Sequence, residues 1–306
     1  MSELNELLAS LRKKQVRLTL RGPQLLFDAP MGSLSDEDLG MIQLHKDAII
    51  TLLQKSSDGQ SLPQLTKQRR GAHLPLSYAQ QRLWFLDNLG TAHSAYNVIL
   101  PMRLRGVLSF EALSESLTQL VSRHEILRTR FNFGNGQGEQ IVEAPRRVSL
   151  DMIDLTSLSS EVREQSAQER IQKDALRPFD LKSGPLFRVL VLRLSAQEHV
   201  LLLTMHHIIT DEWSTDVLMR ELTALYNGSV QGEPSLLGEP EIQYADVALW
   251  QRQSMESGAL DGQLTYWKRQ LSGIPKSLDL PTDRSRPTVA SYRGSSHRFT
   301  LHKEAV

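Results

Sequence analysis

An apolar segment that ends in two adjacent histidines constrains the fold of this chain more than any other feature. Residues 200–205 are almost entirely apolar, and a short run of this kind predicts a buried strand. His206 and His207 follow directly, and Asp211 comes four residues after the second histidine. Neighbouring strand residues point to opposite faces, so we expect one imidazole to face a cavity while the other packs behind it.

This pattern favours a catalytic site at the tip of a strand, because imidazole is the side chain best suited to proton transfer near neutral pH. A zinc site is an alternative, since imidazole and carboxylate both bind zinc. It is disfavoured because adjacent strand residues diverge and no third ligand is obvious nearby. A pair of hydrogen-bonded interior histidines is the purely structural alternative. Motifs elsewhere in the chain favour the catalytic interpretation.

Length and composition exclude several classes of protein. The 306 residues suffice for two domains, or for one domain with an appendage. The formal net charge is zero, which gives no reason to expect a nucleic acid or an anionic membrane as partner. The lack of cysteine excludes disulfides and thiolate chemistry. Without a signal peptide or a run of ~20 apolar residues, the expected location is cytoplasmic.

Residues 1–54 are predicted to form a small domain with the order αββα(α). A helix is predicted from apolar residues at helical spacing, namely Leu4, Leu7, Leu8 and Leu11. Two short strands flank the turn signal Gly22-Pro23. A helix start is predicted at Ser35, which precedes an acidic first turn and an apolar pattern long enough for two helices. A unit this small gains stability from a partner.

Residues 55–72 are polar and lack apolar periodicity, so we predict a linker. Residues 73–306 are predicted to form a mixed α/β domain with a substantial sheet. Ser77 and Gln80 have the spacing of a capping box. Strands are predicted at residues 98–108, 131–133, 186–194 and 200–205. Helices are predicted around residues 113–121, 159–176 and 217–225, the last ending near Asn227-Gly228.

Several segments resemble, in order, the motifs of nonribosomal peptide synthetase condensation domains. These segments are residues 76–86 (LSYAQQRLWFL), 123–131 (RHEILRTRF), 206–214 (the HHxxxDG motif), 244–250, 266–267 and 280–284. Residues 2–54 are similar to the TubC-like docking domain that precedes some of these synthetases. The resemblance implies a chloramphenicol-acetyltransferase-like fold. It also implies a second lobe that would only be starting where the chain stops at Val306.

The resemblance further implies the reaction. Two carrier domains would bring a donor and an acceptor, each as a thioester of 4′-phosphopantetheine, into a tunnel between the two lobes. The amine of the acceptor would attack the donor thioester and form an amide bond. No directly bound cofactor and no metal are implied. With most of the second lobe absent, we expect this polypeptide alone to be a poor catalyst.

The resemblance assigns roles to the residues of the central motif. His207 would lie at the reaction centre, whereas His206 would be structural. Asp211 would form an ion pair with an arginine beyond the end of this chain. Glu212 stands where the family usually has glycine, and its backbone N–H would stabilise the oxyanion. The glutamate disfavours a positive φ, so we expect a tolerated variant whose side chain turns away. Ser214 would cap the following helix or line the tunnel.

Other motif residues are predicted to be structural. Arg82 and Trp84 belong to an amphipathic helix, and Arg123, His124 and Arg128 are expected to form a half-buried polar network. Around the first helix end and the hairpin lie five cations, namely Arg12, Lys13, Lys14, Arg17 and Arg21. They are either a solvated surface or a landing site for the acidic C-terminal tail of an upstream peptide or polyketide synthase subunit.

Three alternatives to an amide-forming domain stay open. A docking module that recruits partners without catalysis is favoured by Glu212 and by the truncation. An epimerisation relative is disfavoured by the docking domain and the opening motif. An acyltransferase that uses soluble coenzyme A would show turnover with acetyl-coenzyme A. A heterocyclisation relative would have aspartates in place of His206 and His207.

Overall fold

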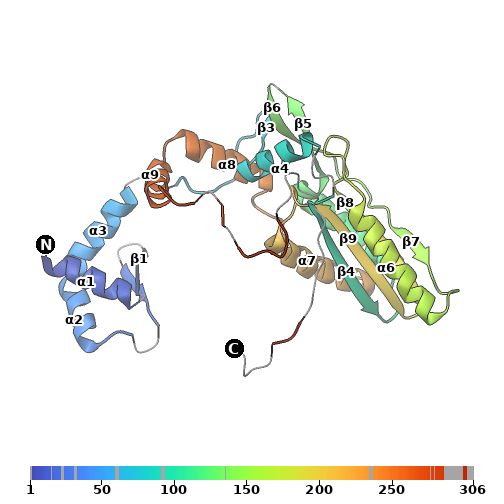
Figure 1. Cartoon of the computed structure of the whole chain (residues 1–306), viewed down its shortest axis with the longest axis horizontal. Coiled ribbons are helices and arrows are strands. Elements are labelled where there is room, and N and C mark those ends of the chain that lie inside the picture. Colours follow the sequence, from blue (N-terminus) through green and yellow to red (C-terminus); the bar gives the residue numbers. More distant parts are fainter. Residues whose placement is uncertain are drawn as a thin grey trace. The chain divides into compact units, whose positions relative to one another are not determined.

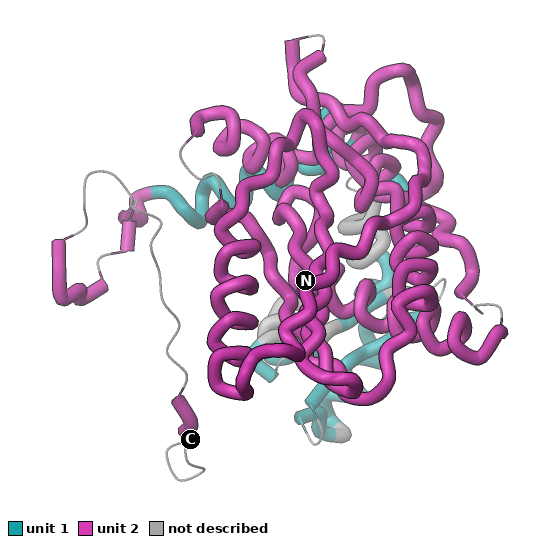
Figure 2. The backbone as a smooth tube through the Cα atoms, turned by 90° about the vertical axis from the view of Figure 1, so that its right-hand side faces the viewer, with its two compact units in different colours: residues 1–64, 254–272 teal, residues 65–253, 273–306 magenta. Residues whose placement is uncertain are grey.

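A computed structural model describes residues 2–14, 16–21, 24–30, 33–58, 62–90, 94–134, 136–233, 237–275, 277–278, 280–285 and 299–301. The chain divides into two compact units. One comprises residues 1–64 with 254–272, and the other comprises residues 65–253 with 273–306 (Figure 2).

The first unit begins with the predicted αββαα order (Figure 1). Its elements are α1 (Ser2–Lys13), β1 (Arg17–Arg21), β2 (Gln24–Asp28), α2 (Asp36–Leu44) and α3 (Lys46–Asp58). The two strands form an antiparallel hairpin. Ser35 caps α2 as predicted, in a capping box with Asp38. Buried apolar residues from the helices and from the start of the hairpin make the core, namely Leu7, Leu11, Val16, Ile42 and Ile49. Helix α3 continues into the segment predicted as a linker. A further helix, α9 (Asp261–Gln270), belongs to this unit.

The second unit is built on a four-stranded sheet with the order β4-β9-β8-β7. Its strands are β4 (Asn97–Arg105), β7 (Asp151–Asp154), β8 (Phe187–Ser195) and β9 (Glu198–His206). β7 pairs with β8 in parallel, and the other pairs are antiparallel. The register sets His206 opposite Asn97, at the last pair between β9 and β4.

Helices cover both faces of this sheet. Helices α5 (Phe110–Arg123) and α7 (Glu212–Gln231) share one core with alternate residues of β9, including Leu203 and Met205. Helix α6 (Ser160–Leu176) contributes Ala167 to a second core with Val200 and with Leu192 of β8. Because each face of β9 meets helices, every residue from 199 to 206 is buried, as is typical of central strands that are covered on both faces.

A smaller antiparallel sheet has the order β3-β6-β5. Its strands are β3 (Leu74–Pro75), β5 (Thr129–Gly134) and β6 (Gln137–Val142). Helix α4 (Tyr78–Asn88) begins at the predicted capping box of Ser77 and Gln80, and its Trp84 stacks on Phe133 with 6.0 Å between ring centroids. Helix α8 (Tyr244–Glu256) is linked to α4 by a 3.0 Å hydrogen bond between the hydroxyls of Tyr244 and Ser77.

The structure moves several predicted boundaries and adds a strand. Strand β4 ends at Arg105 and not at residue 108. Helix α7 does not end near Asn227-Gly228 but runs to Gln231, and Gly232 ends it with a left-handed φ of 70°. A glycine within a helix costs only about 1 kcal/mol, whereas a left-handed C-terminal residue favours glycine strongly. Strand β7 was not predicted.

The end of the predicted linker is fixed to the second unit. Arg70 donates to the fully buried carboxylate of Asp246 from Nε and from its terminal nitrogen, both at 3.0 Å. Its other terminal nitrogen lies 2.5 Å from a carboxylate oxygen of Glu125. Asp246 also accepts the backbone N–H of Gln243 at 2.9 Å. Burial acts to raise the pKa of Asp246, but these hydrogen bonds, above all those of Arg70, outweigh it and lower the pKa.

Candidate active site at the tip of strand β9

The backbone at the end of β9 is fixed on both sides. The N–H of His206 donates to the carbonyl of Leu186 at 3.0 Å, and the N–H of His207 donates to that of Tyr96 at 2.8 Å. The chain then turns, because the N–H of Ile209 donates back to the carbonyl of His206 at 3.0 Å. These hydrogen bonds determine where the two imidazoles lie.

His206 is the interior member of the pair, with 1% of its surface exposed. Its ring lies edge-on to Phe179 at 6.3 Å and tilted against Tyr96 at 6.2 Å. Its Nδ1 accepts the backbone N–H of Ile208 at 3.1 Å. Burial, with a smaller contribution from the neighbouring His207, lowers the pKa of His206 to about 4. The ring is therefore neutral near pH 7 and cannot exchange protons with a substrate.

His207 is the exposed member of the pair. Its Nδ1 lies 2.6 Å from the carbonyl oxygen of Thr210. A carbonyl oxygen only accepts hydrogen bonds, so Nδ1 carries a proton. In the neutral ring this leaves Nε2 with a lone pair that can accept a proton or a hydrogen bond.

His207 lines a cavity of about 540 Å³, which is within the size range of small-molecule sites. Residues from four of the predicted motif segments line this cavity together. They include Gln80, Arg82, His124, Thr210, Asp211, Ser214 and Tyr244. Four of the predicted motif residues do not line this cavity, namely Trp84, Arg123, Arg128 and Glu212. Arg82 is exposed and forms no ion pair or side-chain hydrogen bond within the described part of the chain.

Asp211 caps helix α7. Its carboxylate accepts the N–H of Ser214 at 2.8 Å and the hydroxyl of Ser214 at 2.5 Å. Both hydrogen bonds lower the pKa of the Asp211 carboxyl, and the one from the Ser214 hydroxyl has the larger effect. Among the residues that the structure describes, no cation pairs with this carboxylate. An aspartate directly before a helix typically accepts from the free N–H groups of its first turn. The ion pair with an arginine beyond the end of this chain stays a prediction.

Glu212 is the first residue of α7, and its side chain is exposed. The helical backbone means that no positive φ is required here, so the predicted conflict with glutamate does not arise. A carboxylate in the first turn also suits the positive end of the helix. The backbone N–H groups of Glu212 and Trp213 have no acceptor among the described residues, as expected for the first positions of a helix. Trp213 lines the cavity and is 80% exposed.

A polar network surrounds the neighbouring residues Arg123 and His124. Glu221 of α7 accepts from Arg123 Nε at 3.0 Å and from His124 Nε2 at 2.6 Å. Gln243 donates to the carbonyl of Arg123 at 2.9 Å. Arg128 donates to the carbonyl of Glu143. Glu221 and Gln243 could not be found from the sequence, because they lie about a hundred residues away from their partners and belong to no recognisable pattern.

The docking cations are described only in part. Lys14 pairs with Asp38 at 2.5 Å, and this contact, followed by hydrogen bonds from Ser35, lowers the pKa of Asp38 to about 2. Lys14 is therefore partly neutralised, whereas Lys13 is exposed. The side chains of Arg12, Arg17 and Arg21 lie outside the described residues.

Metal-binding clusters and membrane-spanning helices were also sought. Within the described ranges, no three His, Asp or Glu side chains are grouped so that they could hold a metal ion. None of the described helices is long and apolar enough to span a membrane.

The sequence matches two family models. The model of the condensation domain matches residues 71–306, and that of the TubC N-terminal docking domain matches residues 4–55. A linear gramicidin synthase from Brevibacillus parabrevis is 43% identical over 84% of this chain and 3% of the relative. Chondramide synthase cmdD of Chondromyces crocatus is 42% identical over 75% of this chain and 6% of the relative. The chain thus spans only a small part of the length of these relatives.

Solved structures agree with the family assignment. The X-domain from teicoplanin biosynthesis is 32% identical, with a TM-score of 0.65 over 74% of this chain and 49% of that one. The EpoB cyclization-docking bidomain from Sorangium cellulosum is 24% identical, with a TM-score of 0.72 over 92% of this chain and 55% of that one. The second likeness supports the fold alone and confirms the predicted fold class. The chain therefore belongs to the condensation-domain family of nonribosomal peptide synthetases and carries a TubC N-terminal docking domain.

Proposed function

We propose that residues 71–306 take part in amide-bond formation between a carrier-bound donor thioester and a carrier-bound acceptor amine, with His207 at the reaction centre. The observation that carries the proposal is the fixed imidazole of His207. Its Nδ1–H is bound to Thr210, and the ring lines a cavity large enough for a substrate. Both substrates would arrive on 4′-phosphopantetheine arms, and the chain itself would hold no cofactor.

In this mechanism Nε2 of His207 accepts a hydrogen bond or a proton from the acceptor amine, which aligns the nitrogen lone pair with the thioester carbonyl. The nitrogen attacks the carbonyl carbon, and the carbonyl oxygen becomes an oxyanion. The free N–H of Trp213, which lines the cavity, is a candidate donor to this oxyanion. The N–H of Glu212, to which the family resemblance assigns this role, precedes it in the same helical turn. The C–S bond then breaks, and the thiolate of the donor arm takes up the proton.

A reconstituted assay tests the catalytic proposal. Donor and acceptor carriers are loaded, the full-length parent of this chain is added, and the amide product is measured by mass spectrometry for the wild type, His207→Ala and the control His73→Ala. His73 is an exposed histidine that does not line the cavity. His207→Ala should slow the reaction by roughly a hundredfold or more, and His73→Ala should not. An unchanged rate in His207→Ala would show that the imidazole has no catalytic role and would favour a module that only recruits partners.

We also propose that the docking domain binds the acidic C-terminal tail of a partner synthetase subunit, with the β1–β2 hairpin and its neighbouring cations as the contact surface. Lys13 supports this because it is exposed, whereas Lys14 is engaged by Asp38. Calorimetry with a synthetic tail peptide tests it. Lys13→Glu with Arg17→Glu should weaken binding roughly tenfold at low salt, and equal affinity would contradict the proposal.

A further inference from the structure

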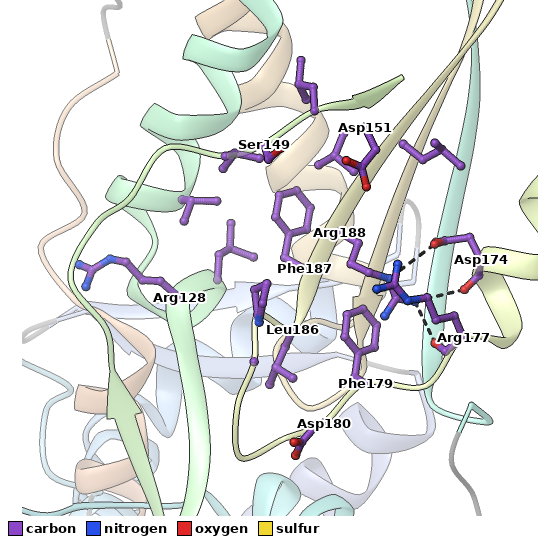
Figure 3. A pocket seen from close by; sticks show the side chains of 18 of the residues that line it. Arg128, Ser149, Asp151, Asp174, Arg177, Phe179, Asp180, Leu186, Phe187 and Arg188 are labelled. Atoms are coloured by element: carbon purple, nitrogen blue, oxygen red, sulfur yellow. Dashed lines mark hydrogen bonds and ion pairs between the residues drawn. The ribbon is translucent and has the colours of Figure 1, made fainter. Parts of the chain in front are cut away.

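The second unit contains another cavity, of about 1610 Å³, which we call the basic cavity (Figure 3). It is lined by β5, by the loop between β6 and β7, by the C-terminal end of α6 with the segment after it, and by the first half of β8. Figure 3 shows Arg128 on one side of it and Asp174, Arg177 and Arg188 on the other. Leu127 is the one residue that also lines the His207 cavity. The basic cavity is therefore a separate site.

The basic cavity exists because one edge of β8 is only partly covered. Strand β9 pairs with β8 from Phe187 onward, but β7 pairs only with Leu190–Arg193. Ahead of β7 the chain is drawn to helix α5. The N–H of Val148 donates to Thr118 Oγ1 at 3.0 Å, and Ser114 Oγ donates to the carbonyl of Val148 at 3.3 Å. A gap therefore opens beside the start of β8.

Backbone groups of β8 are available at this edge. The N–H of His206 donates to the carbonyl of Leu186. Antiparallel pairing alternates, so the next residue, Phe187, directs its N–H and C=O away from β9 and toward the gap. Such an unpaired edge is a template for an added strand.

Five exposed cations border the basic cavity. Arg146 and Arg147 belong to the β6–β7 loop, Arg170 and Lys173 to α6, and Arg177 to the segment that follows. None of these five side chains forms an ion pair or a hydrogen bond to any residue that the structure describes. They are therefore free to bind an anionic group.

The carboxylates that line the basic cavity do not neutralise these cations. Glu143 pairs with Arg130 at 2.5 Å, and Asp174 lies 3.6 Å from Arg188 and accepts from Thr204 Oγ1 at 2.5 Å. Asp180 accepts the hydroxyl of Ser183 at 2.8 Å. Asp151 is the one lining carboxylate without such a partner among the described residues. The positive charge is thus concentrated here, although the whole chain has no net charge.

We propose that the basic cavity docks an acidic, extended segment of a partner polypeptide, which adds a strand to β8 at Phe187 while its carboxylates meet the five cations. A polypeptide is the fitting ligand for two reasons. The volume exceeds the roughly 300–1,000 Å³ of small-molecule sites, and an unpaired strand edge recognises main chain. The proposal is independent of the chemistry at His207.

A binding assay tests the proposal with the full 306-residue chain. The probe is a fluorescein-labelled peptide that alternates glutamate and valine, measured by fluorescence anisotropy at low and at physiological salt. The paired substitutions Arg146→Ala with Arg147→Ala, and Arg170→Ala with Lys173→Ala, should each weaken binding roughly tenfold. Added salt should weaken binding as well. The matched control Arg105→Ala with Arg220→Ala, which removes exposed cations outside this cavity, should bind like the wild type.

Two further probes separate the two parts of the proposal. A peptide of the same charge that is N-methylated at every residue should lose binding, because it has no N–H on either of its edges to donate to the strand. In the wild type, the unmodified peptide should slow amide hydrogen exchange at Phe187. Equal binding of the methylated peptide, or affinities that do not differ between the cavity variants and the control, would overturn the proposal. His207→Ala should leave binding intact, which keeps this result separate from the catalytic test.

Discussion

His207 and Thr210 are joined by a 2.6 Å hydrogen bond in which the imidazole is the donor. The protonated nitrogen of the ring is therefore Nδ1, and Nε2 is the basic one. We predict that ¹⁵N-labelled protein, above the pH at which this ring is protonated, shows nuclear magnetic resonance shifts of an unprotonated Nε2 and a protonated Nδ1 for His207. Shifts of the opposite tautomer would mean that the lone pair points at Thr210 and would remove the proposed base.

Burial of His206 predicts how stability depends on pH. The pKa is lowered from 6.5 to about 4 in the folded protein, so the unfolded chain binds more protons between these two values. Stability should therefore fall as the pH drops from about 6.5 to 4, by roughly 3 kcal/mol from this residue alone. Chemical denaturation at a series of pH values measures it.

The matched variant for this prediction is His206→Asn, which keeps an acceptor for the N–H of Ile208 but does not titrate. Its stability should decline less steeply over the same range. Burial also lowers the pKa of His199, but that contribution is common to both proteins and cancels in the comparison. Parallel curves for the two proteins would show that His206 is protonated without penalty.

The cap formed by Asp211 predicts that two substitutions of this residue differ in their effect on the free energy of unfolding. Asp211→Ala removes the acceptor of both hydrogen bonds from Ser214 and should lower the free energy of unfolding by about 1 kcal/mol. Asp211→Asn keeps a side-chain oxygen at the same place and should stay close to the wild type in stability. Thermal unfolding followed by circular dichroism measures both. Equal losses in the two variants would indicate that the negative charge, rather than the cap, is what stabilises the turn.

The contacts of Arg70 predict that its substitution destabilises the protein strongly, although this residue lies outside any strand or helix. Arg70→Ala leaves the buried carboxylate of Asp246 without its cation and should cost about 3–5 kcal/mol. The control is Arg69→Ala, since Arg69 is exposed and has no ion pair among the described residues. Urea denaturation compares the two. A small effect of Arg70→Ala would mean that water or another group takes over the carboxylate.

The elements that could be predicted from sequence are those whose burial follows a simple period. The apolar runs of β8 and β9 indicated both strands and the position of the histidine pair at the strand end. Ser35 and Ser77 indicated the helix starts because a capping box is a local interaction. The different burial of His206 and His207 does not come from alternation along the strand, because β9 is buried on both faces and ends at His206, so that His207 lies in the turn after it.

What could not be predicted depends on contacts between distant segments. β7 contributes four residues whose burial does not alternate clearly, so its pairing with β8 is visible only in three dimensions. The ion pair expected for Asp211 involves a residue beyond the end of this chain and stays a prediction, whereas the cap that its carboxylate forms was not predicted. The five cations of the basic cavity come from three separate segments, and each segment alone has the composition of an ordinary solvated surface.

Strand β9 is enclosed on both faces as far as His206, and the exposed ring of His207 comes directly after it. Tolerance to substitution should therefore change abruptly between two neighbouring codons. Inside the strand, substitutions should act through folding, whereas at position 207 they should act mainly on the proposed chemistry. If His207 acts as proposed, a single replacement there would remove the chemistry while the architecture persists.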